Sequence, residues 1–252
     1  MSNNSRRDQI YNFLEISGKC TVPELASRFN VTETTIRRDL IQMETQGEII
    51  RKRGYAILPD QGHSLSVRRR NVFQEEKQRI AEKAIQICDG IHSVALDSGT
   101  TVFEMMQLMI SRQSSKKLEI ITCSLSMALE TCKYFHTYVP GGLVFPDELS
   151  IGGSAITGYF DGITADVAFL GTTGIASTSG LTVSYLPMLD VKRALMNCAT
   201  KRVALADSSK FKTRGLYTFC KYAELDTLIT IKTEENARTL DEISKYTEVI
   251  LA

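Results

Sequence analysis

The chain has 252 residues, of which 43% are hydrophobic and 23% charged, and its formal net charge is +1 at pH 7. These values are typical of a globular protein and exclude a disordered chain, so any case for nucleic-acid binding must rest on local basic clusters. The length allows one large domain or two unequal ones, and we expect two.

Cysteine and histidine spacing argues against disulfides and metal sites. The six cysteines form no C-x-x-C pair, and the three histidines lie in separate contexts without metal-ligand spacing. We expect reduced cysteines, no metal and no cofactor. The first ten residues lack the apolar core of a signal peptide, and no apolar run approaches membrane-spanning length, so we expect a cytoplasmic protein without membrane contact.

The first sixty residues predict three helices followed by a hairpin. Thr21 and Glu24, with Pro23 between them, have the form of a capping box at the start of the second helix. Thr32 is a good N-cap for the third helix, and Gly54 suits the turn of the hairpin. The expected elements are a helix over Arg6 to Ser17, a second helix ending at Phe29, a third over Thr32 to Gln46 and a hairpin over Glu48 to Leu58. This order predicts a helix-turn-helix with a wing.

The third helix has two different faces. Ile36, Leu40 and Met43 share one side, whereas Thr34, Arg37 and Arg38 project from the other. Arginines and threonines on an exposed helix suit phosphates, guanine edges and thymine methyls, and basic residues of the wing suit phosphates beside the groove. On periodicity alone, a protein-docking module remains open. The predicted DNA-binding residues are Thr32, Thr34, Thr35, Arg37, Arg38, Arg51, Lys52 and Arg53.

The segment from Arg6 to Leu40 resembles the DeoR family of bacterial transcriptional regulators. The matching residues are Arg6, Ile10, Leu14, Thr32 and the run TIRRDL at 35–40. The resemblance implies a winged helix-turn-helix that binds operator DNA as a regulator, most often a repressor. We place this DNA-binding domain at residues 1–58 and a linker at 59–74, where the composition shifts to PDQGHSLS. Arg68, Arg69 and Arg70 are either a solvated charge run or phosphate contacts.

From residue 75 onward, strand-like and helical patterns alternate. Apolar strand runs lie at 93–96, 118–122, 138–139, 167–170, 202–206, 226–230 and 247–251, and helical stretches lie at 75–88, 101–110, 125–133, 189–199 and 234–244. Alternation of this kind predicts an α/β fold with a Rossmann-like, mostly parallel sheet. We therefore assign residues 75–252 to one α/β domain.

Small, hydroxyl-bearing and glycine residues follow five of these strands. In such sheets ligands bind beyond the carboxyl ends of the strands, and the segment DSGTT leads directly into a helix whose N-terminus favours an anion. Lys192 is either a ligand contact or surface charge on its helix, and Lys210 is the better candidate. Asp97 and Asp207 could accept from sugar hydroxyls. The predicted effector-binding residues are Asp97, Ser98, Gly99, Thr100, Thr101, Ser124, Gly141, Gly142, Gly171, Thr172, Lys192, Asp207 and Lys210.

The second domain also resembles the DeoR family, whose sensor domain is similar in fold to ribose-5-phosphate isomerase and glucosamine-6-phosphate deaminase. DSGTT, Gly141-Gly142, GTTGI, VKRAL and DSSKF occur in the family's order. The resemblance implies a phosphorylated sugar or sugar-acid effector. Its identity is open, because Pro187 and Asp190 stand in a segment where family members frequently carry glutamates.

Two functions follow from these residues. The first is a transcriptional regulator, a repressor of sugar-metabolism genes, that binds a phosphorylated sugar without turnover and has no catalytic residues. The alternative is a sugar-phosphate isomerase-like enzyme with an accessory docking module, for which a carboxylate such as Asp97 or Asp207 would be the base. One recognition helix reads only a half-site, so we expect a homo-oligomer, a dimer or a tetramer.

Overall fold

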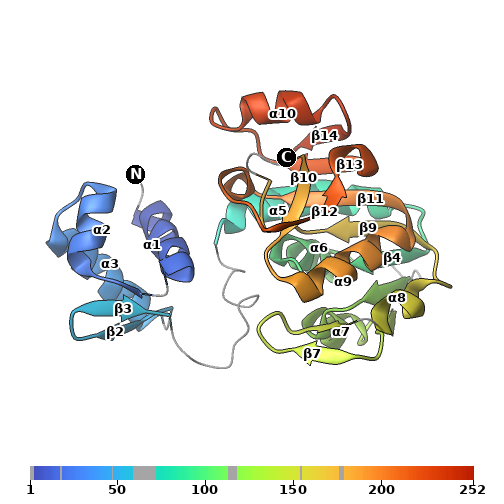
Figure 1. Ribbon diagram of the computed structural model, residues 1–252, viewed down its shortest axis with the longest axis horizontal. Coiled ribbons are helices and arrows are strands. Elements are labelled where there is room, and N and C mark those ends of the chain that lie inside the picture. Colours follow the sequence, from blue (N-terminus) through green and yellow to red (C-terminus); the bar gives the residue numbers. More distant parts are fainter. Residues whose placement is uncertain are drawn as a thin grey trace. The chain divides into compact units, whose positions relative to one another are not determined.

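The computed structural model of the chain describes residues 3–17, 19–46, 48–58, 72–112, 118–153, 155–175 and 179–252. The chain divides into two compact units, Met1–His63 and Ser64–Ala252, drawn in Figure 1. The division lies inside the segment predicted as a linker. Gly47, directly after the predicted third helix, and Arg68 to Arg70 lie outside the described residues.

The first unit is a helix-turn-helix followed by a hairpin. The capping box of Thr21 and Glu24 opens the second helix, and Asn30, in the left-handed region at φ 52°, closes it. Thr32 caps the third helix, whose Ile36, Leu40 and Met43 are buried as predicted. The elements are α1 (Asn3–Ser17), β1 (Lys19–Cys20), α2 (Val22–Phe29), α3 (Glu33–Thr45), β2 (Ile50–Lys52) and β3 (Tyr55–Ile57).

The hairpin belongs to a three-stranded antiparallel sheet, in the order β1-β3-β2. Gly54 makes its turn with φ 93°, a value that L-residues with a side chain rarely adopt. Strand β1 is not predicted, because a strand of two residues is too short to show the alternation of apolar and polar side chains that marks a strand. Cys20 in this strand is buried, and burial raises the pKa of its thiol to about 11.

The second unit is built on a seven-stranded parallel sheet in the order β14-β13-β11-β9-β4-β5-β6. The α/β prediction and the parallel sheet are confirmed. Its strands are β4 (Ser93–Leu96), β5 (Glu119–Thr122), β6 (His136–Tyr138), β9 (Ala165–Leu170), β11 (Ala199–Ala206), β13 (Thr227–Thr230) and β14 (Glu248–Leu251). Its helices are α5 (Gln74–Ala84), η2 (Ile85–Cys88), α6 (Thr100–Ser111), α7 (Leu125–Thr131), α8 (Ala155–Phe160), α9 (Leu186–Asn197), η3 (Ser208–Lys212), η4 (Tyr222–Glu224) and α10 (Ala237–Ile243).

Helices cover both faces of this sheet, because side chains along each strand alternate between two buried cores. Val94 and Leu96 pack with α5 and α6 on one face, whereas Ala95 faces the core formed with α8, α9 and α10. Continuous apolar strands of this kind are typical of parallel sheets. Among the described residues, no helix is long and apolar enough to span a membrane.

Two antiparallel ribbons were missed by the sequence reading. β7 (Leu143–Phe145) pairs with β8 (Ser150–Gly152), and β10 (Gly180–Val183) pairs with β12 (Tyr217–Lys221). No element is predicted for these four segments, because the strands are only three to five residues long and show no clear alternation. The second ribbon joins segments that follow β9 and β11, so only the tertiary fold brings its strands together.

Candidate nucleic-acid interface and candidate effector site

The exposed face of α3 carries the residues predicted to read DNA. Thr34, Arg37 and Arg38 are exposed, whereas Thr32 and Thr35 take part in the cap of the helix. The Thr32 hydroxyl accepts from the Thr35 backbone N–H at 3.3 Å and lies 2.9 Å from the Thr35 hydroxyl. The cap therefore fixes how the first turn of α3 presents its side chains.

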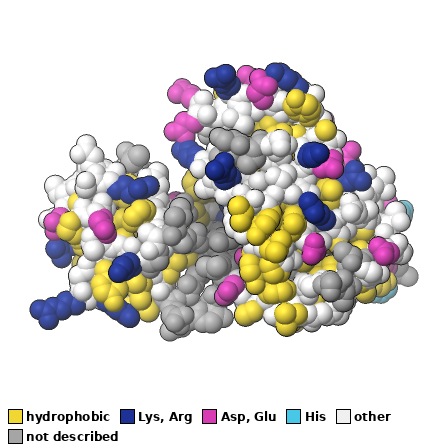
Figure 2. All heavy atoms as spheres, viewed as in Figure 1, with side chains coloured by type: hydrophobic (Ala, Val, Ile, Leu, Met, Phe, Trp, Pro, Cys, Tyr) yellow, Lys and Arg dark blue, Asp and Glu magenta, His cyan; other side chains and the backbone are white. Residues whose placement is uncertain are grey.

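The basic residues of α3 and the wing differ in how they are held. Arg37 donates to Glu33 at 3.1 Å, while no residue in the described part of the chain pairs with Arg38. On the wing, Glu44 of α3 accepts from both the backbone N–H and the guanidinium of Arg51, at 3.3 and 3.2 Å. Lys52 and Arg53 are exposed, and basic side chains protrude in Figure 2 where Figure 1 draws the β2–β3 hairpin.

A buried ion pair fixes α3 from behind. The Arg6 guanidinium of α1 donates to the Asp39 carboxylate with Nε–Oδ2 and Nη2–Oδ1 distances of 2.6 and 3.2 Å, and both side chains are buried. Asp39 belongs to the TIRRDL run, and its carboxylate serves as a structural partner of Arg6. Asp39 points into the unit, so it does not oppose phosphates.

On the second unit, all five predicted loops follow neighbouring strands. The strands that precede them are β11, β9, β4, β5 and β6, a continuous run in the sheet. Because parallel strands share one carboxyl edge, this order gathers the loops along that edge. The topology thus provides the arrangement on which the predicted ligand site depends.

Asp97, Gly171 and Lys192 meet at the centre of this edge. The Asp97 carboxylate accepts from the Gly171 backbone N–H at 2.8 Å and is ion-paired with the Lys192 ammonium. Lys192 also donates to the Gly171 carbonyl at 2.9 Å, and its Nζ lies 5.1 Å from the centroid of the Phe219 ring. Lys192 is therefore buried at the strand ends, and the surface-charge interpretation is wrong.

The DSGTT and GTTG loops touch backbone to backbone. A Cβ on Gly99 would lie 3.1 Å from the Gly171 Cα, and one on Gly171 would lie equally close to the Gly99 Cα. Gly99 is the N-cap of α6 and offers no side chain to it, so the first N–H groups of that helix lack a side-chain cap. Ser98 and Thr100 are half-buried beside Gly99, and Thr101 is buried. Uncapped N–H groups favour an anion.

Thr172 is committed to holding the GTTG loop. Its hydroxyl accepts from the backbone N–H groups of Gly174 and Thr182, at 3.2 and 3.1 Å, and lies within hydrogen-bond distance of both their carbonyls. These bonds attach the loop to β10. Thr172 therefore acts structurally here, whatever its backbone contributes to a ligand.

The loops after β5 and β6 are also locally constrained. Ser124 is buried, and its hydroxyl accepts from the Met127 backbone N–H to cap α7. Gly141 and Gly142 are exposed beyond β6, and a Cβ on Gly142 would meet the Ile151 side chain at 2.9 Å. Only glycine permits this approach of the β6 loop to β8.

The loop after β11 places Lys210 next to a capped turn. Asp207 is buried and is the N-cap of η3. Its carboxylate accepts from the backbone N–H and the hydroxyl of Ser209. Lys210 is half-buried, and its backbone carbonyl accepts from the Ile175 N–H at 2.8 Å. Glu76 of α5, which is not among the predicted residues, binds Ser208 in the same loop.

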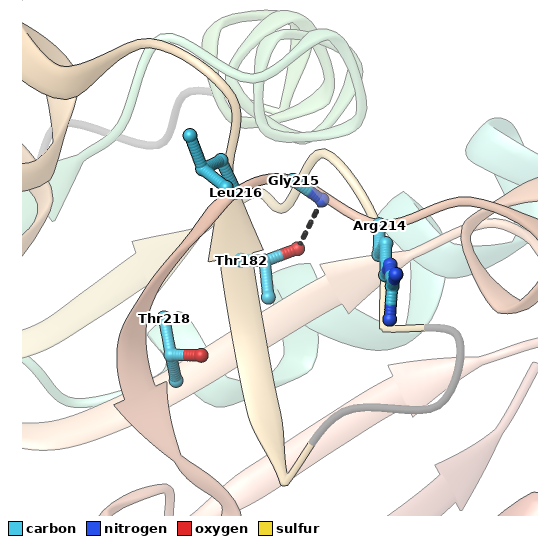
Figure 3. A pocket seen from close by; sticks show the side chains of 5 residues that line it. All are labelled: Thr182, Arg214, Gly215, Leu216 and Thr218. Carbon is cyan, nitrogen blue, oxygen red and sulfur yellow. Dashed lines mark hydrogen bonds between the residues drawn. The ribbon is translucent and has the colours of Figure 1, made fainter.

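An open hollow of about 370 Å³ lies beside the β10–β12 ribbon. It is lined by Thr182, Arg214, Gly215, Leu216 and Thr218, none of which is a predicted site residue. In Figure 3 the Thr182 hydroxyl accepts from the Gly215 backbone N–H, at 2.7 Å, while the Arg214 and Leu216 side chains extend in different directions. The hollow adjoins the GTTG loop, because Thr182 also bonds to Thr172.

Comparisons with known proteins cover both units. Residues 6–62 match the model of the DeoR-like helix-turn-helix domain, and residues 72–232 match that of the DeoR C terminal sensor domain. The chain is 31% identical over 226 residues to the HTH-type transcriptional repressor GlcR of Bacillus subtilis (strain 168), covering 88% of this chain and 85% of that protein. It is 27% identical over 233 residues to the glycerol-3-phosphate regulon repressor of Escherichia coli (strain K12), covering 91% of each. Among solved structures, the sorbitol operon regulator SorC from Klebsiella pneumoniae superposes on 95% of this chain and 99% of its own, with TM-score 0.41 and 11% identity.

Proposed function

The chain belongs to the DeoR family of DNA-binding transcriptional regulators, and on that premise we propose that a phosphorylated sugar bound at the five-loop edge changes its affinity for an operator. The resemblance drawn from TIRRDL and DSGTT is thereby confirmed. The genes it represses would be those of carbohydrate metabolism, as the relatives' names suggest. These relatives include repressors of a glycerol-3-phosphate regulon and of a lactose phosphotransferase system.

The observation that carries the proposal is the gathering of the loops after β4, β9 and β11. This edge combines the uncapped start of α6 with the cations Lys192 and Lys210. Backbone N–H groups and positive charge together suit a phosphoryl group, and hydroxyl and carboxylate groups nearby suit a sugar. The Lys192 ammonium already pairs with Asp97. It would therefore contact a phosphoryl group only by sharing its charge between the two anions or by leaving Asp97.

The bond pattern favours binding over turnover. A base needs a carboxylate that can reach a substrate proton, but the Asp97 carboxylate is held by Lys192 and Gly171, and Asp207 is held by Ser209. The isomerase-like alternative therefore lacks a free carboxylate at the two predicted positions. We propose that the protein is not an enzyme and that it acts in the cytoplasm, where operator DNA is found.

We further propose that the protein works as a homo-oligomer. One α3 reads a half-site, so two copies are needed to read a complete operator. Apolar side chains gather on the second unit in Figure 2, over the region where Figure 1 draws α9 and β7. Leu143 and Leu186 are 65% and 52% exposed, and the rings of Phe145 and Tyr185 pack edge to face at 5.6 Å. An exposed apolar patch of this kind supports contact between copies.

A ligand screen tests the proposal. The full chain is heated with a panel of pentose, hexose and triose phosphates and with the same sugars unphosphorylated, since a bound ligand stabilises the folded protein by RT ln(1 + [L]/Kd). We expect at least one phosphorylated sugar of the panel to raise the midpoint temperature of thermal unfolding and to change the affinity of the chain for its operator. No shift with any member, or a shift without change in operator affinity, would refute the proposal. Product formation from the panel would favour the isomerase-like alternative.

A further inference from the structure

We infer that Glu76 is a positioning residue of the effector loop at 207–210 and that it couples this loop to the start of α5; the inference rests on the proposed function of that loop. Both carboxylate oxygens of Glu76 bind Ser208. Oε2 accepts from the Ser208 backbone N–H and Oε1 from its hydroxyl, each at 2.8 Å. These contacts join segments 132 residues apart in the sequence.

The Glu76 side chain has an unusual partner for a glutamate at its position in a helix. Phe73 is the N-cap of α5, so Glu76 is the third helical residue, where a glutamate normally reaches back to the N-cap backbone. Glu24 does so at the start of α2. Glu76 instead directs both oxygens to Ser208. The first turn of α5 thus depends on the effector loop for an interaction that helices usually make within themselves.

The N-cap Phe73 and the first helical residue Gln74 indicate that the start of α5 is weakly held by its own sequence. Phe73 adopts the left-handed conformation, φ 55° and ψ 38°, which a bulky side chain rarely occupies, and it makes no side-chain cap. The side-chain oxygen of Gln74 is buried without a hydrogen-bond partner among the described residues. A strained cap persists only where surrounding contacts hold it, and the Ser208 contact is one of these.

The location of this turn gives it a regulatory consequence. α5 is the first helix after residues 59–71, through which the chain passes from the DNA-binding unit into the sensor unit. Downstream, α5 packs against α6, β11 and β13. A ligand on Lys210 and its neighbours that moves Ser208 would also move Glu76 and the first turn of α5, since Glu76 holds Ser208 by two hydrogen bonds.

Two variants test the contact from opposite sides, with a matched control. Glu76→Ala removes both carboxylate oxygens, so neither the backbone N–H nor the hydroxyl of Ser208 keeps its acceptor. Ser208→Ala removes the hydroxyl and leaves the backbone N–H. Glu75→Ala is the control, because Glu75 lies in the same first turn, carries the same charge and is exposed.

The first measurement uses the full chain without any sugar phosphate. Coupling between operator binding and effector binding is reciprocal. Operator DNA alone should therefore change amide hydrogen exchange in residues 207–210. We expect this change in the wild-type chain and in Glu75→Ala, its loss in Glu76→Ala and a reduced change in Ser208→Ala. The same change in Glu76→Ala as in the wild-type chain, or no change in the wild-type chain, would overturn the inference.

The second measurement adds the sugar phosphate that gives the largest thermal shift in the panel. Wild-type operator affinity should change by about 5- to 150-fold, the usual range of allosteric coupling, whereas the change in Glu76→Ala should stay within about twofold. An unchanged response in Glu76→Ala would overturn the inference. Absence of any response in the wild-type chain would instead refute the proposed function, while the ligand-free exchange measurement would still decide the role of Glu76.

Discussion

At the scale of single residues, two buried ion pairs hold the positions from which each unit works. Arg6 and Asp39 connect α1 to α3, and Asp97 and Lys192 connect β4 to α9. A buried pair adds little over a well-packed apolar substitute, but removing one partner leaves an uncompensated charge in the interior. Each pair therefore fixes geometry, and removing one partner of either pair should destabilise the unit that contains it.

The Arg6–Asp39 pair predicts a large loss of stability in the DNA-binding unit. Asp39→Ala should cost about 3–5 kcal/mol, because the Arg6 guanidinium stays buried without its carboxylate. A unit of residues 1–63 at roughly 0.05–0.15 kcal/mol per residue has only about 3–9 kcal/mol in total. Amide hydrogen exchange should show lost protection in α1 to α3 and unchanged protection in β4 to β14. Glu33→Ala, on the exposed face of the same helix, is the control and should retain protection.

The two lysines of the sensor unit should separate structure from ligand binding. Lys210 is half-buried and forms no ion pair within the described residues, so Lys210→Ala should keep the thermal midpoint and operator affinity while abolishing the effector response. Lys192→Met should lower the unfolding free energy by about 3–5 kcal/mol, because Asp97 loses its partner. Thermal unfolding with and without the panel's best sugar phosphate measures both effects. Full effector affinity in Lys210→Ala would move the site away from the β11 loop.

At the scale of elements, α3 and the wing present their basic residues differently. Arg38 extends from α3 without a partner in the described part of the chain, whereas Arg37 and Arg51 are each held by a glutamate. These exposed pairs are weak and can exchange for phosphates. The free guanidinium of Arg38 suits bidentate contact with a base edge, while Lys52 on the wing suits phosphate.

Substitutions on these two elements should have distinct effects on binding. Arg38→Ala should cost about 1–3 kcal/mol on the operator and relax sequence preference, whereas Lys52→Ala should weaken operator and random DNA alike. Titrations of both DNAs at several salt concentrations distinguish the two. Equal losses on both DNAs in Arg38→Ala would assign Arg38 to phosphate instead.

At the scale of the whole molecule, the proposed oligomerisation predicts that operator binding depends on the concentration of the protein. Light scattering under DNA-binding conditions should give at least twice the mass of one chain. Leu143→Lys, which places a charge in the exposed apolar patch, should lower that mass and weaken operator binding. Tyr246→Lys is the control, because Tyr246 is also exposed but precedes β14, at the far edge of the sheet from β6. A monomeric wild-type chain that still binds a two-half-site operator would contradict this prediction.

Much of the architecture was readable from sequence because it is encoded locally. The capping box at Thr21, the cap at Thr32 and the alternating apolar strands depend on residues within a few positions of one another. The parallel sheet predicts that the five loops share one edge, but their order along that edge comes from the tertiary structure. The ribbons β7–β8 and β10–β12 were missed, since short strands with polar flanks carry almost no periodic signal.

The sequence by itself determined the family, the helix-turn-helix and the set of candidate loops, because motifs such as TIRRDL and DSGTT lie in contiguous segments. Only the tertiary structure decided which charged groups are engaged and which remain available. Lys192 meets Asp97 across 95 residues and Glu76 meets Ser208 across 132. Burial and ion pairing arise from partners that folding brings together, and no local pattern distinguishes Lys192 from a surface lysine or Glu76 from an ordinary cap residue.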